Sequence, residues 1–366
     1  MAKRRSLAFV TLAASAALLL SACASGGDSS DSGSQDTEGP LRVGAYGSTW
    51  TEAVKATAAK AFTEETGVEV EYVEGNPSDV AAQIYATSAQ GAEPPVDVLT
   101  TDDPTQTQLA QRELLVPVSE YADKVEGLFE NVPTEANNEG YAPPVCDWYI
   151  TLTYNKPKFA ELGLPEPTSW DDLFASELAG RVAIPDITTA MGLPFIFAVS
   201  DGEGMSAGID KIATLDTYSV YTSSGDMQSD MANGNIWAAA TVDGRGWGMV
   251  DSDPEQFGAI IPEVAGADGK IGPRAGSCYY DIVKDTPRLD LAAKFMSHIY
   301  ADETQAEFAA QTGYIPSSPS AIDLLISKDG KWADRIPEID TTVPVNWQEV
   351  VPNIADLTDE FNRKLG

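Results

Sequence analysis

The feature that most constrains the fold is a regular alternation of strand and helix patterns that begins at residue 41. Runs typical of β-strands at 41–47, 68–73 and 96–101 alternate with helical patterns at 51–66 and 77–90, each followed by a glycine. This spacing predicts a wound sheet with parallel strands. Ligands bind such sheets in a crevice beyond the carboxyl ends of the strands. The residues that directly follow each strand are therefore the first candidates for a binding site.

Residues 234–248 are the most informative of these strand ends. The apolar run at 236–242 predicts a short buried strand that releases Asp243, Arg245 and Trp247 into a glycine-rich turn. An acid, a base and an indole at such a point are placed to hold a small polar molecule. The alternative is that Asp243 only caps a helix, Arg245 is a surface charge and Trp247 belongs to the core.

Other predicted strands release polar residues in the same way. The strand at 96–101 is followed by Asp102 and Asp103, and Asp103 precedes a proline, which favours a role as a helix cap. The strand at 180–186 is followed by Thr188 and Thr189, which we expect to begin a helix that continues to about residue 199. Backbone N–H groups at that helix start could bind an anion or a ligand oxygen.

The first forty residues are expected to direct and anchor the protein. Three basic residues precede an uncharged run from 6 to 22, which is the pattern of a secretory signal and is short and alanine-rich for a membrane span. Leu20-Ser21-Ala22-Cys23 resembles a bacterial lipobox, whose cysteine is lipid-modified; an ordinary signal with a chance cysteine is the alternative. The polar residues that follow predict a disordered tether. We therefore expect a signal peptide at 1–22, a tether at 23–40 and a folded part from Leu41.

The remaining length and charge limit the classes of function. About 326 residues exceed one comfortable hydrophobic core, so two lobes are expected. The formal charge is −33, and without the three basic residues of the signal it is near −36. This charge argues against nucleic-acid binding, which needs cationic neutralisation of phosphate, and weakly favours cationic ligands. Solvated acidic surfaces are the commoner explanation. No other segment is long and apolar enough to span a bilayer.

Two cysteines follow Cys23. In an exported chain, Cys146 and Cys278 are candidates for one disulfide. Two buried free thiols are the alternative.

From Leu41 onward, the order of motifs resembles that of a known family. The segments that carry the resemblance are Phe62-Thr-Glu-Glu-Thr-Gly-Val-Glu-Val70, Val96-Asp-Val-Leu99, Leu114-Leu-Val-Pro-Val118, Leu152-Thr-Tyr-Asn155, Pro167-Thr-Ser-Trp-Asp-Asp-Leu173, Leu178-Ala-Gly-Arg-Val-Ala-Ile-Pro-Asp186, Gly234-Asn-Ile-Trp237, Gly244-Arg-Gly-Trp247 and Gly313-Tyr-Ile-Pro316. With the lipobox, they are similar to those of extracellular solute-binding lipoproteins of ABC importers. The similarity is to the polyamine/ferric-iron/thiamine-type group, which has the type II periplasmic-binding-protein fold.

The resemblance implies an α/β protein of two lobes, each a wound sheet flanked by helices, with the ligand cleft between the lobes. The first lobe would comprise residues 41–147 and the second 148–278, while 279–366 would complete the first lobe and add C-terminal helices. The two strands that cross between the lobes would lie side by side, which implies a Cys146–Cys278 disulfide. The protein would capture a small-molecule solute by hinge closure. It would act as a monomer with ABC-transporter permease subunits, and only the lipid on Cys23 would hold it to the outer face of the cell membrane.

We expect the residues of the pocket to lie at the strand ends and on the two strands that cross between the lobes. They are Tyr46, Ser48, Trp50, Asp102, Asp147, Trp148, Thr188, Thr189, Asp243, Arg245, Trp247, Tyr279, Tyr280 and Asp281. Carboxylates and aromatic rings favour an organic amine such as a polyamine, because a buried ammonium needs a paired acid and aromatic faces attract cations.

Three observations keep other ligands open. Arg245 suggests an amino-acid-like or aminophosphonate ligand, unless it only neutralises Asp243. Paired tyrosines would suit ferric iron, as Tyr279 and Tyr280 are adjacent. However, neighbours on a strand point to opposite faces, so one of these two tyrosines must face away from the pocket.

A secreted serine hydrolase is the alternative from another class. Gly204-Met-Ser-Ala-Gly208 matches the nucleophile-elbow pattern, but an elbow needs a strand that runs directly into the serine turn, and residues 201–203 intervene. The single histidine, His298, lies in a pattern typical of an amphipathic helix, and one histidine excludes most zinc enzymes. We therefore expect no enzyme activity, no metal and no cofactor.

Overall fold

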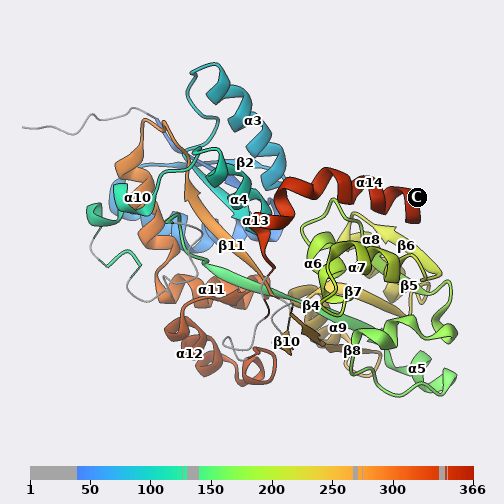
Figure 1. Ribbon diagram of the computed structural model, residues 1–366. Coiled ribbons are helices and arrows are strands. Elements are labelled where there is room, and N and C mark those ends of the chain that lie inside the picture. The colour runs from blue at the N-terminus through green and yellow to red at the C-terminus, as the bar shows by residue number, and fades with distance from the viewer. Residues whose placement is uncertain are drawn as a thin grey trace, which may run out of the picture. The chain divides into compact units, whose positions relative to one another are not determined.

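One long strand, β4 (Cys146–Asn155), connects the two halves of the sheet. The structure is a computed structural model that describes residues 39–125, 127–129, 140–266, 271–273, 275–337, 343 and 345–366. Within these residues, the strands of the main sheet follow the order β2-β1-β3-β11-β4-β7-β5-β6, and β8 and β12 also pair with β4 (Figure 1). We call the part built on β1, β2, β3 and β11 the first lobe, and the part built on β5, β6 and β7 the second lobe. The predicted signal peptide, Cys23 and the tether up to residue 38 lie outside the described residues.

The strands confirm the parallel arrangement expected from the sequence. β1 pairs in parallel with β2 and β3, and β5 pairs in parallel with β6 and β7, whereas β11 runs antiparallel to β3 and β4. The bounds are β1 Leu41–Ala45, β2 Val70–Glu74, β3 Val98–Asp102, β5 Val182–Pro185, β6 Thr217–Tyr221, β7 Ala238–Val242, β8 Phe257–Ile260, β11 Ala275–Ile282 and β12 Ile315–Pro316, with β9 Glu263–Ala265 and β10 Ile271–Pro273 forming a separate two-stranded sheet.

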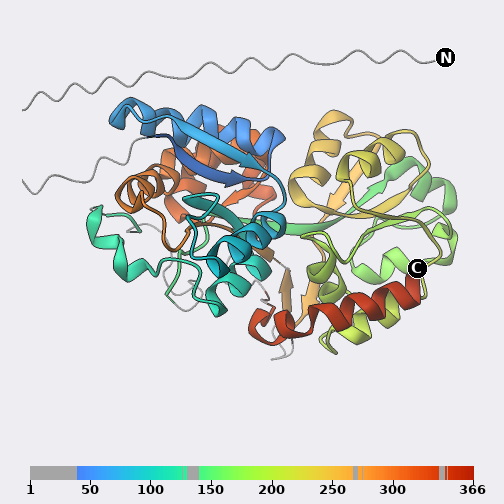
Figure 2. The same ribbon diagram turned by 90° about the horizontal axis from the view of Figure 1, so that it is seen from above.

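Helices flank both halves of the sheet (Figures 1 and 2). The α-helices are α1 Ser48–Val54, α2 Lys60–Thr66, α3 Pro77–Ala89, α4 Asp103–Gln111, α5 Lys156–Leu162, α6 Gly192–Ala198, α7 Met205–Ile212, α8 Ser224–Ala232, α9 Asp243–Ser252, α10 Leu289–Ile299, α11 Asp302–Thr312, α12 Pro319–Lys328, α13 Trp347–Val350 and α14 Ile354–Leu365. The π-helical segment η1 (Lys55–Ala59) joins α1 to α2, and η2 Val118–Glu120, η3 Ala122–Lys124, η5 Trp170–Phe174, η6 Ser176–Leu178, η7 Gly330–Asp334 and η9 Val351–Asn353 are 3₁₀ turns.

A close contact at Gly246 sets the position of α9 on the sheet. Thr151, Thr153 and Thr241 form a buried hydroxyl cluster on β4 and β7. A Cβ atom at Gly246 would lie 2.6 Å from the hydroxyl oxygens of both Thr151 and Thr153, so only glycine allows α9 to pack this closely. This packing holds Asp243, the first residue of α9, at the end of β7.

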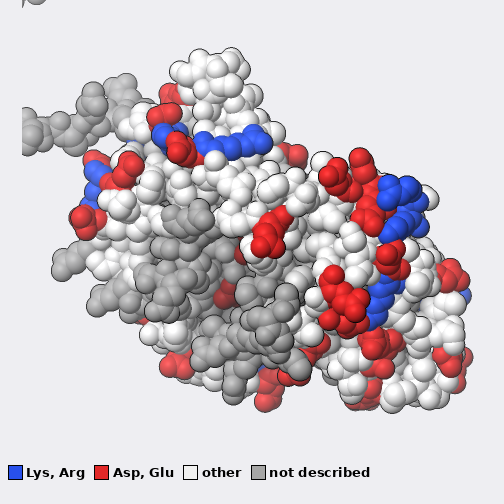
Figure 3. Space-filling model, in the orientation of Figure 1, with Lys and Arg blue, Asp and Glu red and all other residues white. Residues whose placement is uncertain are grey.

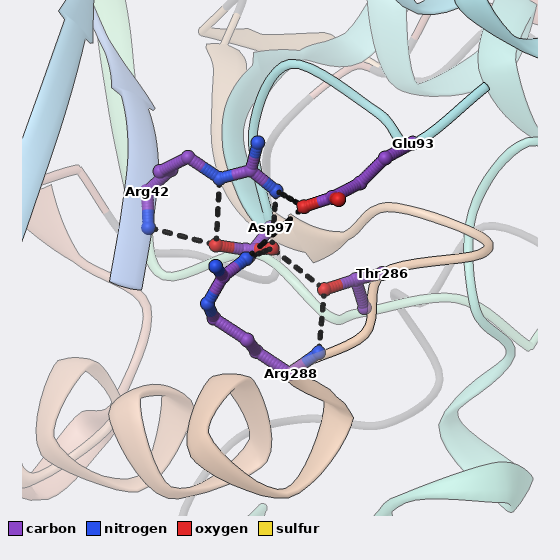
Figure 4. Close-up of polar contacts among 5 residues, drawn as sticks. All are labelled: Arg42, Glu93, Asp97, Thr286 and Arg288. Carbon is purple, nitrogen blue, oxygen red and sulfur yellow. Dashed lines mark hydrogen bonds and ion pairs between the residues drawn. The ribbon is translucent and has the colours of Figure 1, made fainter. Parts of the chain in front are cut away.

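A network of ion pairs stabilises the first lobe where β1 begins (Figure 4). The fully buried carboxylate of Asp97 accepts hydrogen bonds from the backbone N–H of Arg42 at 2.8 Å and from Thr286 Oγ1 at 2.7 Å. The guanidinium groups of Arg42 and Arg288 bind both Asp97 and Glu93. Burial opposes ionisation of Asp97, but these hydrogen bonds outweigh it and hold the pKa of the carboxyl below its usual value. The network therefore joins β1, the start of β3 and the segment after β11.

On the face drawn in Figure 3, acidic side chains are spread over the surface and basic ones form smaller groups among them. Much of the net charge on this face is therefore solvated, as the commoner explanation of the composition requires. In the part of the chain that the structure describes, no helix is long and apolar enough to cross a membrane.

Candidate functional site

Asp243 is the most unusual polar group near the crossing strands. Its side chain is 1% exposed, and its Oδ1 accepts a hydrogen bond from the N–H of Gly244 at 2.8 Å. Its Oδ2 is buried and has no partner with good hydrogen-bond geometry among the described residues, although the backbone N–H of Tyr149, like that of Gly244, acts on the carboxyl. Burial, together with the nearby charge of Asp147, raises the pKa of Asp243 to about 8. A buried carboxyl with a free oxygen is costly to maintain, which makes it a candidate to bind a ligand.

Asp147 and Asp103 meet the returning strand β11 in the same region. Asp147 accepts hydrogen bonds from the hydroxyls of Ser277 at 2.7 Å and Ser317 at 3.2 Å. Asp103 accepts one from the N–H of Ser277 at 2.9 Å and one from the hydroxyl of Tyr279 at 3.0 Å. These contacts bring the carboxylates of β4 and α4 to β11 where the lobes join, and the charge of Asp147 also acts on Asp243 of α9. Sequence reasoning missed Ser277 and Ser317, since single serines carry no distinctive pattern.

Two of the predicted pocket acids, Asp102 and Asp281, make structural contacts in the first lobe. Asp102, not Asp103, caps α4, because its Oδ1 accepts the N–H of Thr105 at 3.0 Å. The prediction that Asp103 is the cap was therefore wrong. Asp281 accepts hydrogen bonds from Thr101 Oγ1 at 2.6 Å and Gln106 Nε2 at 3.0 Å, and burial raises its pKa to about 6. Asp281 thus joins β11 to β3 and α4 inside the first lobe.

The adjacent tyrosines of β11 face opposite sides of the sheet. The hydroxyl of Tyr279 donates to Asp103, whereas the hydroxyl of Tyr280 accepts a hydrogen bond from Trp50 Nε1 at 2.9 Å in the core. The alternation of side chains along a strand makes this separation unavoidable. Two hydroxyls that point in opposite directions cannot bind one ion, so the tyrosine-pair interpretation in favour of iron is wrong. The described residues also contain no group of three or more His, Cys, Asp or Glu side chains arranged to hold a metal.

An aromatic cluster occupies the first-lobe side of the junction. The ring of Trp50 lies 5.0 Å from the rings of both Tyr46 and Tyr314 and 4.7 Å from that of Phe308. Trp50 is 5% exposed and bonded to Tyr280, so we assign it to the core. Ser48, the first residue of α1, follows Tyr46 by two positions.

Trp148 is also a core residue. Its side chain is 5% exposed on β4. A Cβ atom at Gly276 would lie 2.1 Å from the indole, so the indole covers the backbone of β11. Trp148 therefore packs the two crossing strands together.

The expected helix start at Thr188 and Thr189 is absent. The N–H and hydroxyl of Thr188 both donate to Asp186 Oδ1, and Thr189 Oγ1 donates to the carbonyl of Asp186, so both residues belong to a turn. α6 begins only at Gly192 and has seven residues. The predicted anion site at this position was wrong, because the side chain of Asp186 satisfies the local donors first.

Two further residues of α9, Arg245 and Trp247, were also predicted to line the pocket. Arg245 is exposed and makes no hydrogen bond or ion pair with the described residues, so it does not neutralise Asp243. The indole of Trp247 lies under the guanidinium of Arg335 at 5.0 Å, and Arg335 also binds Asp251. Trp247 thus contacts the segment after α12.

The two crossing strands lie side by side, as expected, but no disulfide joins them. Cys146 of β4 and Cys278 of β11 are directly opposite in the sheet, and both are buried free thiols. Burial raises the pKa of both thiols, which keeps them in the unreactive neutral form. The expected Cys146–Cys278 disulfide is therefore corrected to the alternative of two buried thiols.

The pattern at Gly204–Gly208 does not form a nucleophile elbow, because no strand runs into the serine. Ser206 lies in α7 after a turn, and its hydroxyl donates to Glu360 Oε2 at 2.8 Å. His298 pairs instead with Glu65 at 2.8 Å, between α10 and α2. The serine and the histidine therefore belong to different lobes and have different carboxylate partners.

Comparisons with known proteins agree with this architecture. A crystal structure of an ABC transporter from Clostridium perfringens has a TM-score of 0.68 and 19% identity over 89% of this chain and 100% of the other. Iron-bound HitA from Pseudomonas aeruginosa has a TM-score of 0.68 and 18% identity over 88% and 99%, and the spermidine/putrescine substrate-binding protein PotD from Streptococcus pneumoniae has 0.66 and 17% over 89% and 99%. At such identities the likeness shows a shared fold.

No curated protein sequence matches the chain. The sequence profile of the family described as bacterial extracellular solute-binding protein matches residues 57–337. Because this match covers more than half of the sequence, the chain belongs to the bacterial extracellular solute-binding proteins.

Proposed function

We propose that the protein is the solute-binding component of an ABC importer and captures a small organic amine by closure of its two lobes. Family membership implies an exported protein that binds a solute. We further propose that residues 1–22 are a signal peptide, that a lipid on Cys23 and a tether to residue 40 hold the protein at the outer face of the cell membrane, and that it delivers its solute to permease subunits as a monomer. The lobes would divide at residues 147 and 278.

The observation that carries the choice of an amine is the free, buried oxygen of Asp243. An ammonium group would donate to Oδ2 and would compensate both Asp243 and the neighbouring Asp147. The hydroxyl of Tyr279 lies in the same region, because the charges of Asp103 and Asp147 act on it. Tyr314 lies there too, because the charges of Asp243 and Arg245 act on it. Aromatic faces favour cations by about 0.5–2 kcal/mol each.

A solute that also carries an anionic group is the second candidate. Arg245 is exposed, lies two residues after Asp243 and has no hydrogen-bond or ion-pair partner in the described parts of the chain. It could therefore bind the acid group of an amino-acid-like or aminophosphonate solute. Structurally similar proteins include iron-bound HitA, AgtB in complex with agropinic acid and a GABA receptor, so the shared fold does not favour either candidate.

Isothermal titration calorimetry on the folded part of the chain, from Gly39, tests this proposal. The panel comprises putrescine, spermidine, thiamine, amino acids, 2-aminoethylphosphonate and ferric citrate. We expect an amine to bind, Asp243→Asn to abolish that binding, and Asp226→Asn, a change on the exposed first turn of α8, to leave it intact. Binding that survives Asp243→Asn would exclude Asp243 as the recognition group. Loss of binding in Arg245→Gln, for a solute with an acid group, would favour the second candidate.

A further inference from the structure

The C-terminal segment 345–365 contacts both lobes outside the crossing strands. It consists of α13, the turn η9 and α14, which follow one another without a break. Its first part packs against α4 of the first lobe, where Gln111 Nε2 donates to Gln348 Oε1 at 2.7 Å and Trp347 is 8% exposed. We call this segment the C-terminal strap. Figures 1 and 2 both show α14, in red, running from the side of α4 towards the helices of the second lobe.

The other end of the strap is bound to α7 of the second lobe. Glu360 Oε2 accepts a hydrogen bond from Ser206 Oγ at 2.8 Å, and Lys364 forms ion pairs with Asp210 of α7 and with Glu360. Lys364 and Glu360 are half-buried at this contact, while Asp210 is exposed. The polar part of this contact is therefore open to water and to salt.

The packing behind this end is incomplete. An open pocket of about 650 Å³ lies beside the strap and is lined by Phe197, Met205, Val345, Val350 and Leu357, while Phe361 of α14 is buried in the same core cluster as Ile209 and Ile212 of α7. Apolar side chains that line this open pocket keep part of their surface in water, so the strap gains less from burial here than a fully covered helix would. At the first-lobe end, α13 packs against α4, and Trp347 is 8% exposed.

The two helices that the strap connects, α4 and α7, lie on opposite sides of β4, the strand that joins the lobes. α4 follows β3, and α7 lies between β5 and β6 in the chain, whereas β4 stands between these strands in the sheet. Rotation of the lobes about the crossing strands would change the separation of α4 and α7. The strap spans that separation, so it must detach at one end or resist the rotation.

We propose that the C-terminal strap restrains the opening of the two lobes and that its contact with α7 is the end that releases. This proposal rests on the proposed motion of the two lobes and does not depend on which solute binds. Contacts made only in the closed form stabilise that form. Because exposed and half-exposed ion pairs contribute little individually, loss of the Lys364–Asp210 pair should raise the ratio of open to closed protein about two- to fivefold. The apparent dissociation constant of any solute would rise by no more than the same factor.

Pulsed electron paramagnetic resonance on the solute-free protein from Gly39 tests the proposal. Spin labels at Ala86→Cys on α3 and Ala213→Cys after α7 report the distance between the lobes, and both positions are exposed. The native cysteines are 3% and 2% exposed and escape labelling. We expect Lys364→Met to broaden the distance distribution towards longer values, and 1 M NaCl to have the same effect on the unmodified strap but little further effect on the variant.

Lys328→Met is the control, because it removes an exposed ion pair, with Glu307, that joins α12 to α11 within one part of the fold. A third label at Ala355→Cys on α14 identifies the end that releases. In the Lys364→Met variant, the 213–355 distance should lengthen while the 86–355 distance stays constant. Identical interlobe distributions for Lys364→Met and Lys328→Met would overturn the restraint, and lengthening of the 86–355 distance alone would overturn the assignment of the releasing end. Ser206→Ala, which removes only the hydroxyl contact with Glu360, provides a milder second variant.

Discussion

Asp243→Asn should change how the stability of the solute-free protein depends on pH. In the folded chain, burial raises the pKa of Asp243 to about 8, against an ordinary value of 3.8. Between these values, the folded protein retains a proton that the unfolded chain has lost. The contribution of Asp243 to stability is therefore complete below pH 3.8 and declines as the pH rises towards 8.

The magnitude follows from the difference in pKa. The free energy of unfolding should fall by about 1.4 kcal/mol per pH unit from this group, and the total loss by pH 7 should be about 4 kcal/mol. An asparagine does not titrate, and its side-chain oxygen can still accept the N–H of Gly244. The unpaired amide of the variant adds a cost that does not depend on pH. The slope of the difference between the two proteins, and not its offset, is thus the informative quantity.

Urea unfolding at several pH values between 4.5 and 7.5 measures this slope. The variant should gain stability relative to the unmodified protein as the pH rises, by about 4 kcal/mol over the three units. Asp226→Asn serves as the control, because that residue lies on the exposed first turn of α8 and its variant should follow the unmodified protein. Parallel curves for Asp243→Asn and the unmodified protein would refute the claim that Asp243 is buried and protonated.

Three further predictions follow from named contacts. Binding of an amine at pH 7 should release up to about one proton, because Asp243 must ionise to pair with the ammonium group. Calorimetry in two buffers with different ionisation enthalpies measures the number of protons released. Equal apparent binding enthalpies in the two buffers would contradict this prediction. Asp97→Asn should cost about 3–5 kcal/mol in urea unfolding at pH 7, since it leaves Arg42 and Arg288 without their buried partner. The pKa of Asp97 is lowered by folding, so this difference should shrink as the pH falls below the ordinary value of 3.8, and a constant difference would argue against the ion pairs. Gly246→Ala should destabilise the protein by about 1–3 kcal/mol. Gly248→Ala should stabilise α9 slightly, because a Cβ atom there meets no atom within 4 Å. Equal melting temperatures for the two variants would disprove the close contact at Gly246.

The alternation of local patterns was enough to predict the parallel strands, whereas the adjacency of β4 and β11 was expected only from the resemblance to a known family. The first of these depends on hydrophobic periodicity and on the order of elements along the chain. The roles of individual acids were harder to predict. Asp102 and Asp103 are adjacent, and only the direction of the backbone at the end of β3 decides that Asp102 caps α4 while Asp103 reaches β11.

The turn at Thr188 shows a second limit of local patterns. Two threonines after a strand are compatible with a helix start, yet the carboxylate of Asp186 binds Thr188 and ends the strand in a turn. Side chains that bond to nearby backbone compete with helix formation over a few residues. The outcome depends on small differences in free energy that a residue pattern does not express.

The burial of Asp243 depends on a contact between segments about seventy residues apart. A Cβ atom at Gly313 would lie 2.6 Å from the Cα of Gly244, so two glycines let the start of α9 meet the loop after α11 backbone to backbone. That contact lies next to Asp243, which directly precedes Gly244 and is 1% exposed, and neither glycine alone predicts it. A solute can reach Oδ2 only if this approach loosens, which requires the second lobe to move away from the loop. The unusual pKa of Asp243 and the restraint by the C-terminal strap are thus linked, because both depend on how often the lobes separate.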